Sequence, residues 1–133
     1  MEEDELRILI ILTYLCMQSA FAASTTQVFV SFSMPRLLLI QTLTESTRLH
    51  IPATLNGLCH NSMPETAKKI LSLSKKIPNL ALQIDPIAFE RYGIHQVPAL
   101  VVDNGKDFDV IYGNLSLHDG LQRLASLRRN KSE

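Results

Sequence analysis

Cysteine is scarce in this chain of 133 residues, and the two that are present, Cys16 and Cys59, do not form a Cys-x-x-Cys pair. Thiol–disulfide exchange needs one thiolate to attack and usually a second thiol to resolve the mixed disulfide, so the ordinary dithiol mechanism is excluded. Without residues 1–22 only Cys59 remains, and an internal disulfide is then impossible. The stability of the fold must therefore come from packing.

Signals for several other chemistries are also missing. The sequence shows no Gly-rich phosphate loop, no paired carboxylates and no Ser-His-Asp arrangement, so we expect no catalytic residues and no cofactor. Cys59 and His60 are adjacent rather than spaced for chelation, and the other three histidines fall in separate predicted elements, so we also expect no metal site.

Charge is low and dispersed. Once Arg7 and the four acidic residues at positions 2–5 are set aside, twelve basic and nine acidic residues remain, a net charge of +3. The basic residues form scattered pairs, so we expect no nucleic-acid binding.

The first 22 residues have the pattern of a secretory signal peptide. An apolar run from Ile8 to Met17 is shorter than the ~20 residues needed to span a bilayer, and Ala20-Phe21-Ala22 supplies a small-x-small cleavage site. The extreme N-terminus is acidic where a signal peptide is ordinarily basic. We therefore predict export, with an uncleaved membrane anchor as the alternative.

The first half of the remaining chain predicts two strands and two helices. Alternating apolar residues predict a strand in 27–33, and Ser33 is expected to cap a helix running from Pro35 to about Leu49. A weaker strand is predicted in 51–57, and capping-box spacing predicts a second helix, 62–77. The residues expected to face inward are Leu37, Ile40 and Leu43 on the first helix, and Met63, Ala67, Ile70 and Ile77 on the second.

The second half predicts a strand at 80–84 and a short helix that begins at Asp85-Pro86 and ends at Gly93. Asn104-Gly105 predicts a turn that joins strands 99–103 and 109–112 into a hairpin. Ser116 is expected to cap a final helix that carries Leu117, Leu121, Leu124 and Ala125, before a frayed polar tail, 127–133.

The predicted order is β-α-β-α-β-α-β-β-α, typical of an α/β domain whose mixed central sheet has helices on both faces. The sequence therefore predicts a thioredoxin-like three-layer sandwich that spans residues 27–126 and lacks Cys-x-x-Cys.

Four segments resemble one known family. These are VFVSFSMP (28–35), GL (57–58), IDPIAFERYGIHQVPALVV (84–102) and IYGNLSL (111–117). They are similar to the TrbC-type pilus-assembly proteins of F-type conjugation systems. Where the family usually has an arginine before the glycine that closes the second strand, this chain has Asn56.

The resemblance implies a thioredoxin-like protein of the Gram-negative periplasm, in a family sometimes fused to a protein called TraW. It implies a part in assembling the conjugative pilus and type IV secretion system for plasmid transfer, with other transfer proteins, TraW-like ones among them, as partners. Contact with the membrane would be made only through an uncleaved N-terminal segment.

Two segments are predicted to form the partner-binding groove: Ser33-Met34-Pro35 and Gln96-Val97-Pro98. In the thioredoxin layout, the first occupies the corner that would carry the redox cysteines. Ser33 cannot replace a cysteine there, and Met34 either adapts to a partner or fills a gap in the core. A cis Val97-Pro98 bond is expected from the fold, and it would leave the main chain of Val97 open to an extended peptide.

Two alternatives to a non-catalytic assembly factor stay open. Cys59 lies beside His60 and just before a helix N-terminus, which could favour its thiolate, so a degenerate thiol–disulfide oxidoreductase or isomerase is the second reading. Burial at a strand end is the simpler account of this cysteine. A membrane-tethered structural protein is the third reading, and it depends on whether residues 1–22 are cleaved.

Overall fold

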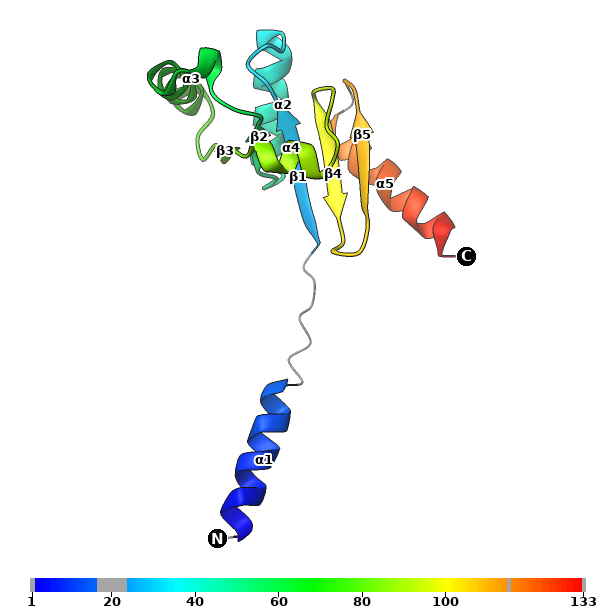
Figure 1. The fold of residues 1–133 in the computed structure, drawn as a ribbon. Helices are drawn as coiled ribbons and strands as arrows, with labels where there is room; N and C mark the ends of the chain where they lie inside the picture. Colours follow the sequence, from blue (N-terminus) through cyan, green and yellow to red (C-terminus); the bar gives the residue numbers. More distant parts are fainter. Residues whose placement is uncertain (1, 17–23, 115, 133) are drawn as a thin grey trace.

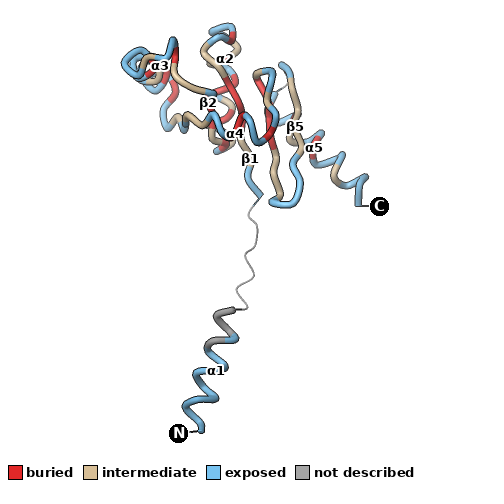
Figure 2. Tube along the Cα trace, viewed as in Figure 1, coloured by how far each residue is buried: buried red, intermediate tan, exposed pale blue. Residues whose placement is uncertain are grey.

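The structure is a computed structural model, and it describes residues 2–16, 24–114 and 116–132. Helix α1 (Glu2–Cys16) occupies most of the predicted signal peptide, and the predicted cleavage point after Ala22 lies outside the described residues. The described part of α1 is coloured as exposed (Figure 2). Its exposed residues include large apolar ones such as Leu9 and Ile11. Among the described residues, no helix has both the length and the apolar character needed to cross a membrane.

A five-stranded mixed sheet forms the centre of the domain, in the order β3-β2-β1-β4-β5 (Figure 1). Its strands are β1 (Thr25–Val30), β2 (Ala53–Leu55), β3 (Leu82–Ile84), β4 (Ala99–Asp103) and β5 (Phe108–Tyr112). Strands β1, β2 and β3 are parallel, whereas β4 is antiparallel to both β1 and β5. The predicted parallel crossovers and the closing hairpin are therefore confirmed.

Successive residues of β1 point to opposite faces of the sheet, and each face has its own core. Val28 and Val30 pack with apolar residues of α2 (Arg36–Arg48), α3 (Met63–Lys76) and α5 (Leu117–Lys131). Phe29, fully buried, packs on the other face against Phe89 and Tyr92, in and just after α4 (Pro86–Arg91). Helices thus cover both faces, as the sequence predicted, and the buried positions cluster in the central strands (Figure 2).

Three of the predicted helix caps form. The side chain of Ser62 accepts a hydrogen bond from the N–H of Glu65, Asp85 from Ala88, and Ser116 from Asp119. At the end of α4, Gly93 has φ +61, which glycine adopts without steric cost. These local signals positioned the helix starts correctly.

The inward faces of α2 and α3 differ in part from the predicted ones. Leu37 is 76% exposed and Met63 is 59% exposed, whereas Leu39 and Leu73 are buried. Ala67 is exposed as well. Leu43 and Ile77 are buried as predicted, and Ile40 and Ile70 are half-buried. Both helices carry more apolar residues than one face can bury, so periodicity alone identified only some of the inward residues.

The final helix is longer than predicted. Helix α5 continues to Lys131 through most of the stretch expected to be a frayed tail, and Ala125 is exposed on it. The guanidinium of Arg128 donates to the Asp109 carboxylate at 2.7 Å and to the carbonyl oxygen of Val102 at 2.8 Å. These bonds attach the last turns of the helix to the hairpin.

Candidate functional site

Two adjoining hollows lie where strands β1 and β2 end. The first, about 180 Å³, is lined by residues from the loops after β1 and β2 and from the segment around the end of α4: Ser31, Ser33, Asn56, Phe89, Ile94, His95, Gln96 and Val97. The second, about 260 Å³, is lined by Ser31, Phe32, Leu55, Asn56, Gly57, Leu58 and Cys59. Because the hollows share Ser31 and Asn56, we describe them together as the groove.

The position of the groove follows from the topology of the sheet. Strands β1 and β2 are parallel and end together at Val30 and Leu55, while the neighbour of β1 on its other side, β4, runs the opposite way. The chain therefore leaves the carboxyl ends of β1 and β2 in one place, where α/β sheets ordinarily form their binding crevices.

Two hydroxyl groups occupy the corner at the start of α2. The Oγ atoms of Ser31 and Ser33 lie 2.8 Å apart, and the backbone N–H of Ser33 donates to Ser31 Oγ at 3.1 Å. Ser33 does not cap α2 as predicted, because the N-cap position is held by Pro35, which has no side-chain cap. The corner therefore presents a paired-serine surface without any thiol.

Met34 does not project into the groove. Its side chain is 7% exposed and belongs to the main core, and its Sδ accepts a hydrogen bond from the N–H of Ser31 at 3.4 Å. It contributes instead to a separate hollow of about 290 Å³ between α2 and α3, lined also by Phe32 and Lys69. Of the two readings left open for Met34, the structure therefore favours gap filling.

The segment Gln96-Val97-Pro98 lies across the groove from the serine pair. Gln96 is exposed, Val97 is half-buried, and the Val97–Pro98 peptide bond is cis, as expected. Within the described part of the chain, neither the N–H nor the carbonyl of Val97 has a backbone hydrogen-bond partner.

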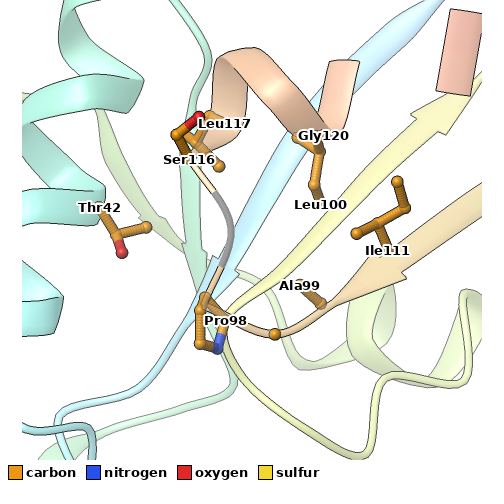
Figure 3. Close-up of a pocket in the computed structure, with 9 residues that line it drawn as sticks. Thr42, Pro98, Ala99, Leu100, Ile111, Ser116, Leu117 and Gly120 are labelled. Atoms are coloured by element: carbon orange, nitrogen blue, oxygen red, sulfur yellow. The ribbon is translucent and has the colours of Figure 1, made fainter. Parts of the chain in front are cut away.

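Pro98 is turned away from the groove. It is buried and lines a cavity of only about 10 Å³ beneath the first turn of α5, beside Leu100 and Gly120 (Figure 3). Such a cavity is about the size of one water molecule. Pro98 lines this cavity and neither hollow of the groove.

Hydrogen bonds fix the rim that carries His95. The Tyr112 hydroxyl donates to the carbonyl oxygen of Gly93 at 3.1 Å, and His95 Nδ1 lies 3.1 Å from the same oxygen. The rings of His95 and Tyr112 lie 4.8 Å apart between their centroids. The rim is therefore anchored to β5.

A second anchor precedes this rim. The Tyr92 hydroxyl donates to the Asp103 carboxylate at 2.7 Å. The backbone N–H of Gly105, followed by the Tyr92 hydroxyl, holds the pKa of Asp103 below its ordinary value. Burial, followed by the bond to Asp103, raises the pKa of Tyr92. This bond ties the end of α4 to the end of β4.

Cys59 lies at the other end of the groove, in a single 3-10 turn (Cys59–Asn61). It is 8% exposed, and its N–H donates to Thr66 Oγ1 at 2.8 Å. Its Sγ lies 3.7 Å from His60 Nδ1, which in turn lies 2.9 Å from a carboxylate oxygen of Glu65. Contrary to the argument from sequence spacing, the adjacent residues Cys59 and His60 thus come together with a third side chain.

The structure brings only part of the predicted site together. Ser33, Gln96 and Val97 line one hollow, while Pro35 is exposed at the start of α2 and Met34 and Pro98 face elsewhere. Ser31 and Ile94 were not among the residues predicted for the site, and Asn56 was predicted only as a departure from the family pattern. The signal that could have found Ser31 and Asn56 is their position just after a strand. Parallel strands bring the residues that follow them to one edge of the sheet.

Comparison with known proteins identifies relatives by sequence. A family model described as type-F conjugative transfer system pilin assembly protein matches residues 28–124. The periplasmic protein TrbC of Escherichia coli strain K12 is 44% identical over 98 residues, which are 74% of this chain and 46% of that protein. The chain thus matches about half the length of this curated relative.

Solved structures show the same fold at low sequence identity. MTB DsbF, solved in mixed oxidized and reduced forms, has a TM-score of 0.55 at 17% identity and covers 80% of this chain and 82% of its own. Bacillus subtilis StoA has a TM-score of 0.52 at 10% identity, covering 74% and 79%. The predicted thioredoxin-like fold is therefore confirmed.

Proposed function

Starting from the fact that the chain belongs to the family of type-F conjugative transfer system pilin assembly proteins, we propose that it is a non-catalytic assembly factor that holds an extended segment of another transfer protein in its groove. The sequence predicts a periplasmic location, and the Escherichia coli relative is named a periplasmic protein. A TraW-like protein is the partner that we expect.

The observation that carries this proposal is the paired serine corner. Thiol exchange in this fold uses cysteines at the start of the helix that follows the first strand, where the helix dipole lowers the thiol pKa. Here the hydroxyls of Ser31 and Ser33 stand 2.8 Å apart at that place, facing the exposed Gln96 across the hollow. A serine hydroxyl is not a nucleophile for disulfides, so this corner supports binding alone.

The opposite side of the groove supports an extended ligand. Since the N–H and carbonyl of Val97 lack backbone partners within the described residues, an incoming strand could pair with both. The hollow beside them is lined by apolar Ile94 and Phe89 and by polar Asn56 and Gln96, which would give side-chain selectivity. We infer that main-chain pairing supplies affinity and the hollow supplies specificity.

Filling the first hollow tests this proposal. Ser33→Trp and Gln96→Trp place a large ring at exposed positions on either side of it, and Gln122→Trp on the exposed side of α5 is the matched control. From cells that carry the full transfer apparatus, the tagged wild type and the α5 variant should recover a transfer protein identified by mass spectrometry. Both groove variants should lose most of it, and equal recovery by all four proteins would contradict the proposal.

A thiol enzyme remains the second candidate, and one observation favours it: Cys59 lines the second hollow of the same groove. A disulfide reductase assay on the purified protein decides between the two. The assembly-factor proposal expects no thiol-dependent turnover above background, whereas turnover that disappears in Cys59→Ser would establish the enzyme.

A further inference from the structure

Three side chains of metal-ligating type gather where the 3-10 turn meets the start of α3. The Sγ of Cys59, the Nδ1 of His60 and a carboxylate oxygen of Glu65 all lie within 4.8 Å of one another. They combine the sulfur, nitrogen and oxygen donors that bind Zn²⁺ in proteins. The other three histidines contribute nothing to this cluster.

The distances fit a single small ion. Zinc bonds are about 2.3 Å to sulfur and about 2.0–2.2 Å to nitrogen and oxygen, so tetrahedral ligand atoms stand roughly 3.3–3.7 Å from one another. In the structure, Sγ lies 3.7 Å from Nδ1, and Nδ1 lies 2.9 Å from the Glu65 oxygen. The third distance, from Sγ to the Glu65 oxygen, is at most 4.8 Å. Opening the Nδ1–oxygen distance and closing the Sγ–oxygen distance, each by no more than about 1 Å, would place all three donors around one ion.

The exposure of the three side chains also suits an ion that enters from solvent. Cys59 is 8% exposed and sits at the inner end, whereas the side chains of His60 and Glu65 are 80% and 54% exposed. The inner ligand is held in place, since the N–H of Cys59 donates to Thr66 Oγ1. The two outer ligands are free to adjust.

We propose that Cys59, His60 and Glu65 form a Zn²⁺ site, with the fourth coordination position open to water. The thiol of Cys59 would bind as thiolate and release its proton, and the proton on His60 Nδ1 would move to Nε2 or to solvent. The ion would replace the direct contact between His60 and Glu65 as the link between the turn and α3. This inference rests on other observations than the peptide-binding proposal does, although Cys59 also lines the second hollow of the groove.

Metal titration of the full chain tests the site. In a Cys16→Ser background, so that Cys59 is the only thiol, Zn²⁺ is titrated into the reduced protein by calorimetry under anaerobic conditions. One ion per chain is expected, and Co²⁺ in its place should produce tetrahedral visible bands with a thiolate charge-transfer band. The absence of that thiolate band would overturn the assignment of Cys59.

Variants of the exposed ligands avoid disturbing the core. His60→Gly tolerates the left-handed backbone at this position (φ 49), and Glu65→Gln leaves the backbone bond to Ser62 in place. Each should weaken Zn²⁺ binding at least tenfold, while the thermal unfolding curve without metal changes little. His118→Ala, on α5, is the matched control and should bind as the parent does. Equal affinity in all these proteins, or no binding at micromolar Zn²⁺, would overturn the proposal.

Discussion

Glu45 on α2 caps α5 at Leu117, although the two residues are 72 positions apart in the chain. One carboxylate oxygen of Glu45 accepts from the N–H of Leu117 at 2.9 Å, and the other accepts from the N–H of His118 at 3.2 Å. A carboxylate suits this place because a helix N-terminus presents unpaired N–H groups and partial positive charge. The contact holds the first turn of α5 over the small cavity that Pro98 also lines.

Removing this cap should weaken the fold. We expect Glu45→Ala to lower the free energy of unfolding by about 1–2 kcal/mol, since it frees two backbone donors at a helix start. Gln41→Ala, an exposed position on the same helix, is the control and should stay within about 0.5 kcal/mol of the wild type. Urea unfolding followed by circular dichroism measures both, and equal effects would contradict a capping role.

The bond between Tyr92 and Asp103 should make stability depend on acidity. Because the pKa of Asp103 is lowered in the folded state, its ionised form stabilises the fold above the unfolded pKa of about 4, and this contribution is lost as the pH falls through the folded pKa. Between pH 7 and pH 3, the free energy of unfolding should fall less for Asp103→Asn than for the wild type. Tyr92→Phe should destabilise more at pH 7 than at pH 3. A Tyr92→Phe effect that does not change with pH would contradict this account.

The last turns of α5 should depend on one arginine. Arg128 contacts both the Asp109 carboxylate and the Val102 carbonyl and is partly buried, so Arg128→Ala should lower the free energy of unfolding by about 1–2 kcal/mol. Its neighbour Arg129 is exposed, and Arg129→Ala should change the free energy of unfolding by less than about 0.5 kcal/mol. Thermal melts of the two variants compare them directly. If both variants melt at the same temperature, the tail beyond residue 126 is not held by Arg128.

Local signals were enough to predict most of the fold. Ser62, Asp85 and Ser116 each mark a helix start because a short polar side chain bonds a backbone N–H three residues ahead. Gly93 marks a helix end for a similarly local reason. The order of elements followed, and with it the parallel and antiparallel pairings.

The features that could not be predicted from the sequence depend on contacts between distant segments. Nothing near Glu45 in the sequence signals that it caps a helix 72 residues away, and nothing near Arg128 signals its bond to Asp109. The sequence places Met34 at the corner but does not show which way its side chain points, so a contact with a partner and a place in the core were both open. His60 has a left-handed backbone conformation (φ 49). The side chains of the adjacent residues Cys59 and His60 lie close together there, which residue spacing alone does not predict.

The most direct test of a binding groove without redox chemistry is photocrosslinking in cells that carry the transfer apparatus. A photoreactive residue is placed at position 33, at position 96, or at position 122 on α5 as the control. The account predicts that positions 33 and 96 both capture the same transfer protein, in a product that resists reducing agents, and that position 122 captures none of it. Capture from position 122 alone would contradict the account. So would a crosslinked product at position 33 or 96 that reducing agents break.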